Sequence, residues 1–185
     1  MIKDVLKDTE DRMHKTVEAL RADLVSIRTG RASPALVERL QVDYYGVPTP
    51  MNQLAGISVP EPRMLMIRPW DPKSLGVIQK AILGSDLGLT PTNDGQVIRL
   101  NIPQLTEERR RDLNKQVARR VEEGRISVRN IRRDAVDMMR ELEKEKMISE
   151  DDLADGRDEV QKLTDTYVKQ VDDVGKAKEA EIMEK

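Results

Sequence analysis

The stretch from Thr106 to Lys146 constrains the fold most, because no proline interrupts it and its pattern is helical throughout. Apolar and small residues recur there in alternating steps of three and four, as on the buried face of a helix in a bundle. They are Leu113, Val117, Val121, Gly124, Val128, Ile131, Ala135, Met138 or Met139, and Leu142. Thr106 is predicted to cap the helix, and Glu107 and Glu108 favour the positive end of its dipole. A helix roughly 60 Å long needs partners along its whole length.

Two further stretches repeat this pattern at the ends of the chain. Ile2 to Ile27 is predicted to form a first long amphipathic helix, which we expect Gly30 to end. Ser149 and Asp152 resemble a capping box that opens a third helix. Because the connection before Ser149 is short, the second and third helices should be antiparallel neighbours. Three helices with one apolar stripe each predict a three-helix bundle.

Residues 31–104 have a different composition, since all nine prolines lie there. Proline breaks helices, so this region cannot continue the bundle and is predicted to be a separate domain. Its predicted elements are strands at Gln41–Tyr45, Gly56–Val59, Arg63–Arg68 and Gln96–Ile102, a turn at Asn93–Gly95, a helical segment over Pro72–Leu83 and a short helix starting at Ser33-Pro34.

The predicted fold is therefore α+β. Residues 1–30 and 105–185 should form an elongated antiparallel three-helix bundle, into which residues 31–104 insert a small β/α/β domain. Two short connections would join the domains, giving an L-shaped molecule with a two-stranded hinge. The predicted hinge residues are Thr29, Gly30, Pro103 and Gln104. Simple termination of helices is the alternative explanation for Gly30 and Pro103.

The composition excludes several classes of site. The chain has no cysteine and one histidine, His14, which we expect at the surface. The chain therefore lacks the residues for a disulfide framework and almost all of those for a zinc site or a Ser-His-Asp triad. We expect no catalytic residue, metal or cofactor. No apolar run approaches the roughly 18 to 20 residues that cross a bilayer, and no signal peptide is evident. We expect a soluble, cytoplasmic protein without membrane contact.

A cluster of arginines lies in the middle of the second helix: Arg125, Arg129, Arg132 and Arg133. At 100° per residue these side chains fall within about one quadrant, roughly 110° from the apolar stripe, so they should point outward. Guanidinium groups at helical spacing can bind phosphates. The alternative is an ordinary solvated face, neutralised by the nearby acids Asp134, Asp137 and Glu141. Against it, no acid lies four residues before or after Arg125, Arg129 or Arg132.

Two other classes of function are open to such a chain. A coiled-coil adaptor would pair with another protein through the bundle, although each helix shows only one apolar stripe, which the bundle itself uses. An RNA-modifying enzyme would use the inserted domain, whose acids lack a histidine, cysteine or phosphate-binding loop beside them. Tyr44, Tyr45 and Trp70 are candidates for base stacking, but we expect them in the core of the domain.

Six ordered motifs resemble the bacterial ribosome recycling factor family over essentially the whole chain. They are Ile27–Pro34 (IRTGRASP), Tyr44–Pro50 (YYGVPTP), Ser85–Leu89 (SDLGL), Leu105–Arg110 (LTEERR), Val128–Ala135 (VRNIRRDA) and Ile148–Asp152 (ISEDD). Several motifs of this length, in order and without a large gap, are far more specific than one glycine pattern.

The resemblance implies a non-enzymatic translation factor. Members of that family bind the ribosome after termination and, with elongation factor G and its GTP hydrolysis, split it into subunits, releasing messenger and deacylated transfer RNA. The family places its bundle on large-subunit ribosomal RNA. Carried over, this implies RNA contacts at Arg129 and Arg132, with Arg125 and Arg133, and at Arg28 and Arg31 near the hinge. The partners implied are the ribosome and elongation factor G, with the chain acting as a monomer.

Overall fold

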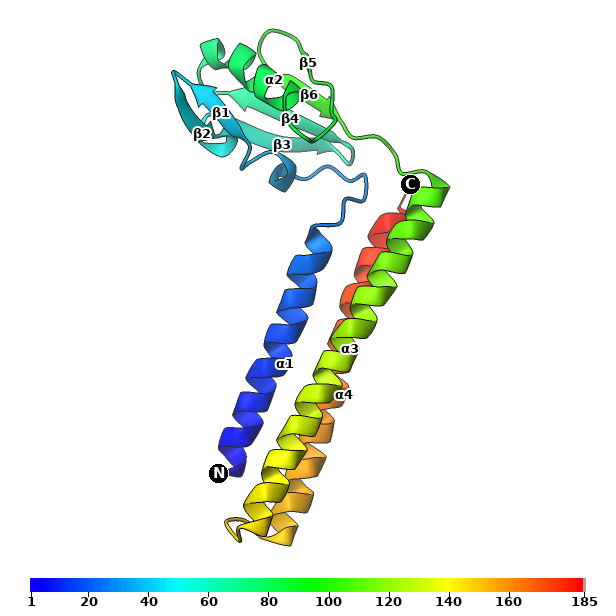
Figure 1. Ribbon diagram of the computed structural model, residues 1–185. Helices are drawn as coiled ribbons and strands as arrows, with labels where there is room; N and C mark the ends of the chain where they lie inside the picture. Colours follow the sequence, from blue (N-terminus) through cyan, green and yellow to red (C-terminus); the bar gives the residue numbers. More distant parts are fainter. Residues whose placement is uncertain (185) are drawn as a thin grey trace. The chain divides into compact units, whose positions relative to one another are not determined.

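The computed structural model describes residues 1–184 and divides into two units, which are drawn in Figure 1. Met1–Arg28 and Thr106–Glu184 form one, which we call the helical unit. Thr29–Leu105 forms the other, the β-rich unit. The chain is thus α+β with long helices and a small β domain, which confirms the predicted fold class.

The helical unit contains α1 (Ile2–Val25), α3 (Glu107–Lys144) and α4 (Glu150–Met183). Each helix packs against the other two, and a short turn joins α3 to α4 (Figure 1). Both predicted caps are present. The Thr106 hydroxyl accepts a hydrogen bond from the Arg109 N–H at 3.1 Å. Ser149 and Asp152 exchange the two hydrogen bonds of a capping box, at 3.0 and 3.1 Å.

The predicted stripes form the core of the helical unit, with small shifts. On α3 the buried positions run from Leu113 to Met139, and Met139 is the buried methionine of the pair while Met138 is half exposed. On α1, Val5 is buried and Leu6 is half-buried against the same cluster. Glycine lets the helices approach closely: a Cβ on Gly175 of α4 would lie 2.5 Å from Val121 Cγ2 of α3.

Helix α1 ends at Val25, two residues before the predicted Ile27, and Gly30 is not the residue that ends it. The hydroxyl of Ser26 donates to the carbonyl oxygen of Asp23 at 2.6 Å, and the Arg120 guanidinium donates to the same oxygen at 3.1 Å. These two donors satisfy a carbonyl at the end of the helix, as C-terminal carbonyl groups require. Gly30 has a different role, in the β-rich unit, where its φ is +80°.

The β-rich unit holds two antiparallel sheets and one helix. Its strands are β1 (Gln41–Tyr44), β2 (Val47–Pro50), β3 (Ala55–Glu61), β4 (Met64–Pro69), β5 (Thr92–Asn93) and β6 (Ile98–Asn101). β1 pairs with β2, and the other sheet has the order β3-β4-β6-β5. Helix α2 (Leu75–Leu83) packs on β1, and it follows a single 3-10 turn, Pro72–Ser74. Two further 3-10 turns are Pro34–Leu36, capped by Ser33, and Met51–Gln53.

The core of this unit lies between α2 and the strands, around Leu65, Ile67, Ile78, Ile82 and Leu100. The four predicted strands are present as β1, β3, β4 and β6, and the Asn93–Gly95 turn joins β5 to β6. Two strands were not predicted, the two-residue β5 and β2. The two prolines of β2 argue against a strand, but β2 pairs on one side only, with β1, and prolines are tolerated in such edge strands.

Candidate nucleic-acid interface

Arg129, Arg132 and Arg133 lie in the middle of α3, where the helix is flanked by α4. Arg129 and Arg133 are exposed and Arg132 is half-buried. Beneath them Val128 and Ile131 are buried in the bundle, so the backbone that carries the arginines is held by packing. These three side chains therefore point away from the core, as predicted.

A groove of about 500 Å³ runs between α3 and α4 at this level, and Arg129 and Arg132 line its α3 wall. The α4 wall is Gln161, Thr164, Asp165, Val168, Lys169, Asp172, Asp173 and Lys176. The sequence analysis did not single out Lys169 and Lys176, although their spacing of seven places them on one side of a helix. The groove therefore has cations on both walls.

Arg132 is held by a chain of two hydrogen bonds. Its Nη1 donates to Gln161 Oε1 at 3.2 Å, and Gln161 Nε2 donates to Asp165 Oδ1 at 2.9 Å. Within residues 1–184 no carboxylate lies within 4.0 Å of Arg129, Arg132 or Arg133. The positive charge of the three side chains is thus not cancelled by a direct ion pair.

The nearby acids that could have neutralised these arginines are paired with other cations. Asp134 pairs with Arg12 of α1 at 3.1 Å. The other two pairs lie within α3: Asp137 with Arg140 at 3.7 Å, and Glu141 with Lys144 at 3.5 Å. Asp134, Asp137 and Glu141 therefore form their ion pairs with cations other than Arg129, Arg132 and Arg133.

Arg125 differs, and the expectation that it presents a free guanidinium is wrong. Its Nη1 contacts Glu122 Oε2 at 2.8 Å, and its Nε and Nη2 contact Asp172 Oδ1 of α4 at 2.7 and 2.6 Å. The hydrogen bond with Glu122, and then that with Asp172, raise the pKa of Arg125 above its ordinary value. The sequence analysis considered acids four residues away, but Glu122 lies three residues before Arg125 and Asp172 lies on another helix.

Arg28 and Arg31 are both exposed, but neither lines the groove between α3 and α4. Arg28 is in the helical unit and Arg31 in the β-rich unit. Of the predicted hinge residues, Gly30 lies against the other connecting segment: a Cβ there would be 3.2 Å from the Pro103 carbonyl oxygen. Thr29 is buried, and the Gln104 amide faces the guanidinium of Arg63.

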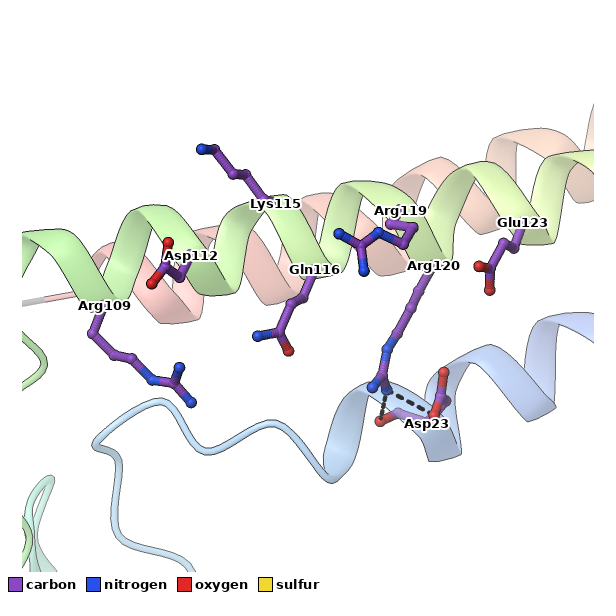
Figure 2. A pocket seen from close by; sticks show the side chains of 8 residues that line it. All are labelled: Asp23, Arg109, Asp112, Lys115, Gln116, Arg119, Arg120 and Glu123. Atoms are coloured by element: carbon purple, nitrogen blue, oxygen red, sulfur yellow. Dashed lines mark hydrogen bonds and ion pairs between the residues drawn. The ribbon is translucent and has the colours of Figure 1, made fainter.

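A second groove, of about 620 Å³ and lined by both cations and acids, lies on the other side of α3, facing α1. Figure 2 shows Arg120 reaching from α3 to Asp23 of α1, whose carboxylate it contacts at 2.7 Å. Arg109 and Arg119 also line this groove. The sequence analysis missed it, because its cations alternate along α3 with acids that give it a mixed charge.

The aromatic side chains depart from the prediction that they belong to the core. Tyr45 is 77% exposed and Trp70 is 66% exposed, whereas Tyr44 is half-buried and packs on the core. Tyr45 occupies the turn between β1 and β2 with a φ of +51°, and Trp70 follows the last residue of β4. Both therefore stand where a strand has ended and its alternation between core and solvent no longer applies.

Two other kinds of site have no support in the structure. Among residues 1–184 no group of three or more acids, or acids with His14, is placed to hold a metal ion. None of the helices there is both long enough and apolar enough to cross a bilayer. His14 is exposed on α1, in agreement with its prediction as a surface residue.

The chain matches the family model described as "Ribosome recycling factor" over residues 20–183. The chain belongs to the ribosome recycling factor family. A ribosome-recycling factor of Syntrophomonas wolfei is 59% identical over 184 residues, covering 100% of both chains. The ribosome-recycling factor of Carboxydothermus hydrogenoformans is 57% identical over 183 residues, covering 99% of both.

Solved structures from the ribosome recycling factor family share the fold. A solution structure of the ribosome recycling factor matches with a TM-score of 0.74 at 43% identity, covering 98% of this chain and 97% of that one. A second structure describes the T. thermophilus ribosome recycling factor and the E. coli elongation factor G bound to the E. coli post-termination complex. It matches with a TM-score of 0.64 at 44% identity, over 100% of both chains.

Proposed function

We propose that this chain recycles ribosomes after termination by binding ribosomal RNA of the large subunit through the groove between α3 and α4. The observation that carries the proposal is the set of Arg129, Arg132 and Arg133, whose charges no carboxylate within residues 1–184 cancels. Guanidinium groups recognise phosphate oxygens through paired donors, and a fixed helical spacing lets them meet several phosphates at once. Membership of the ribosome recycling factor family supports RNA as the ligand.

The second part of the proposal concerns elongation factor G. A related chain has been described together with that factor on a post-termination complex. We infer that the chain makes and breaks no bond itself, and that GTP hydrolysis by elongation factor G drives the separation of the subunits. The β-rich unit would receive the motion, through the two connections that include Gly30 and Pro103. Messenger and deacylated transfer RNA would then leave, and the chain would act as a cytoplasmic monomer.

The first test replaces one arginine. Arg132→Ala should weaken binding to purified large ribosomal subunits and make the salt dependence shallower by about 0.7 to 0.9 in the logarithmic slope, because one phosphate contact is lost. Arg21→Ala, on the exposed face of α1 and paired with Glu18, is a matched control outside the groove that should leave the slope unchanged. Binding by sedimentation at several salt concentrations measures both variants. An unchanged affinity and slope for Arg132→Ala would remove Arg132 from the site.

The activity itself is tested by ribosome splitting. Post-termination ribosomes mixed with the chain, elongation factor G and GTP should separate into subunits, and should remain intact when either factor or GTP is left out. Intact particles under all conditions would contradict the recycling function even if RNA binding is found.

A further inference from the structure

Two arginines of α3, Arg132 and Arg125, contact side chains of the α4 wall of the groove, and the side chains they contact differ in charge. The two helices are antiparallel, so Arg132 lies opposite Gln161 and Arg125 lies opposite Asp172. Both contacts join a guanidinium on α3 to a side-chain oxygen on α4. The two acceptors differ in charge, because one is an amide and the other a carboxylate.

Gln161 orients Arg132 without cancelling its charge. The contact of 3.2 Å uses only Nη1, so most of the five N–H donors of the guanidinium stay available. The amide is itself fixed, since its Nε2 donates to Asp165 at 2.9 Å and its oxygen must then face Arg132. An arginine held in one orientation loses less conformational entropy when it binds a phosphate.

Asp172 and Glu122 have the opposite effect on Arg125. Their carboxylates contact all three nitrogens of the guanidinium at 2.6 to 2.8 Å. One positive and two negative charges leave a local charge of −1, which repels phosphate. The pair is about two-thirds buried on each side, with exposed fractions of 32% for Arg125 and 33% for Asp172, so water screens it less than a fully exposed pair.

We propose that the α4 side chain opposite each arginine determines which arginine binds phosphate: Gln161 positions Arg132 for RNA, whereas Asp172 withdraws Arg125 from it. The inference rests on the proposed function of the groove. The proposal makes the acceptor on α4, and not the arginine itself, the determinant of RNA contact. Exchanging neutral and charged acceptors on α4 should therefore move the RNA contact along α3. Gln161 is thus a positioning residue, which acts through Arg132.

The test exchanges the charge of each acceptor with little change in side-chain size, and Gln161→Glu also removes the N–H group that donates to Asp165. Gln161→Glu places a carboxylate beside Arg132 and should weaken binding to purified large ribosomal subunits about fivefold at 0.1 M salt, with a slope shallower by about 0.7 to 0.9. Asp172→Asn combined with Glu122→Gln should release Arg125 and change affinity and slope by similar amounts in the opposite direction.

Two controls separate this effect from a general change of charge. Thr166→Glu adds the same charge as Gln161→Glu to an exposed site on α4 outside the groove, and Asp173→Asn removes a charge from the groove wall without freeing an arginine. Both should change affinity by less than twofold. Gln161→Glu should also have no further effect in an Arg132→Ala background, as a double-mutant cycle requires when one residue acts through the other.

The possible results distinguish the proposed RNA site from the proposed roles of Gln161 and Asp172. If Arg132→Ala weakens binding but Gln161→Glu and Asp172→Asn with Glu122→Gln match their controls, the positioning rule is overturned and the RNA site stands. If wild-type protein does not bind large subunits, both are overturned. Thermal unfolding of every variant excludes misfolding, and the salt slope is a readout that a purely structural role of Gln161 would not move.

Discussion

At the scale of single residues, position in the local backbone decides how a charge behaves. Asp94 occupies the turn between β5 and β6, where its carboxylate accepts hydrogen bonds from the N–H groups of Val97 at 3.0 Å and Gln96 at 2.9 Å. Arg99 adds an ion pair at 3.0 Å. These donors, the backbone ones first, lower the pKa of Asp94 from 3.8 to about 2.

This shift predicts a pH dependence of the β5–β6 turn. Because the folded pKa lies below the unfolded one, the ionised Asp94 stabilises the turn at pH values above about 4, and this contribution is lost as the pH falls toward 2. Titration of the carboxyl group followed by NMR should have its midpoint near 2, and the amide signals of Gln96 and Val97 should move with it. Asp94→Asn should remove that titration. A midpoint close to 4 for Asp94 would show that the backbone donors do not hold the carboxylate.

At the scale of elements, the three long helices stabilise one another, because the apolar stripe of each is buried against the other two. Glycines on both helices, Gly124 on α3 and Gly156 and Gly175 on α4, lie where a Cβ would meet side chains of the other helix. A Cβ at Gly175 would meet Val121 Cγ2 at 2.5 Å, and one at Gly156 would meet Met139 Sδ at 2.6 Å. The two overlaps are similar in size but different in kind, because valine is stiff at χ1 and methionine is flexible.

Alanine at these two glycines should therefore have unequal effects. Alanine has the higher helix propensity, which favours both substitutions by up to about 1 kcal/mol. At Gly175 we expect the overlap with Val121 to exceed this gain and to destabilise the protein by about 1 to 3 kcal/mol. Gly156→Ala should be closer to neutral, because Met139 can adopt another rotamer and the second contact, with Ile2 at 3.0 Å, is to the end Cδ1 of that side chain. Urea unfolding of both variants measures the difference, and a Gly175→Ala protein as stable as wild type would contradict the close packing.

At the scale of the whole molecule, the chain folds into two units, each with a core of its own. The helical unit has its own buried core, built from all three long helices, and it carries Arg129, Arg132 and Arg133. The β-rich unit has a second core, around α2 and the strands. Two cores in one chain are typical of two bodies that fold separately and move relative to each other.

This division predicts the behaviour of a chain without the β-rich unit. Replacing residues 31–104 with a short flexible Gly/Ser linker should leave a helical protein that binds large ribosomal subunits with nearly the wild-type salt slope. It should not support splitting by elongation factor G and GTP, since nothing is left to receive the motion. Circular dichroism, sedimentation and the splitting reaction measure the three properties. A shortened chain that still splits ribosomes would assign that role to the helices alone.

The sequence by itself determined the features that depend on near neighbours along the chain. The stripes of α1, α3 and α4, the caps at Thr106 and Ser149, and four of the six strands follow from periodicity and from hydrogen bonds within a few residues. Among the arginines, the same local rules predicted that Arg129, Arg132 and Arg133 point outward. They failed for the end of α1, where Arg120 of α3 contacts the last turn, and for β2 and β5, each of which pairs with one neighbouring strand.

Only the tertiary structure decided which charges remain available. Arg125 is neutralised by Asp172, 47 residues further along the chain, and Arg132 is held by Gln161, 29 residues further along. Such pairs depend on the axial register of two helices, which core packing sets and no local pattern records. The exposure of Tyr45 and Trp70 likewise depends on where each strand stops. Periodicity predicts which face of a helix is buried. Only the register of the packed helices determines which groups each outward side chain contacts.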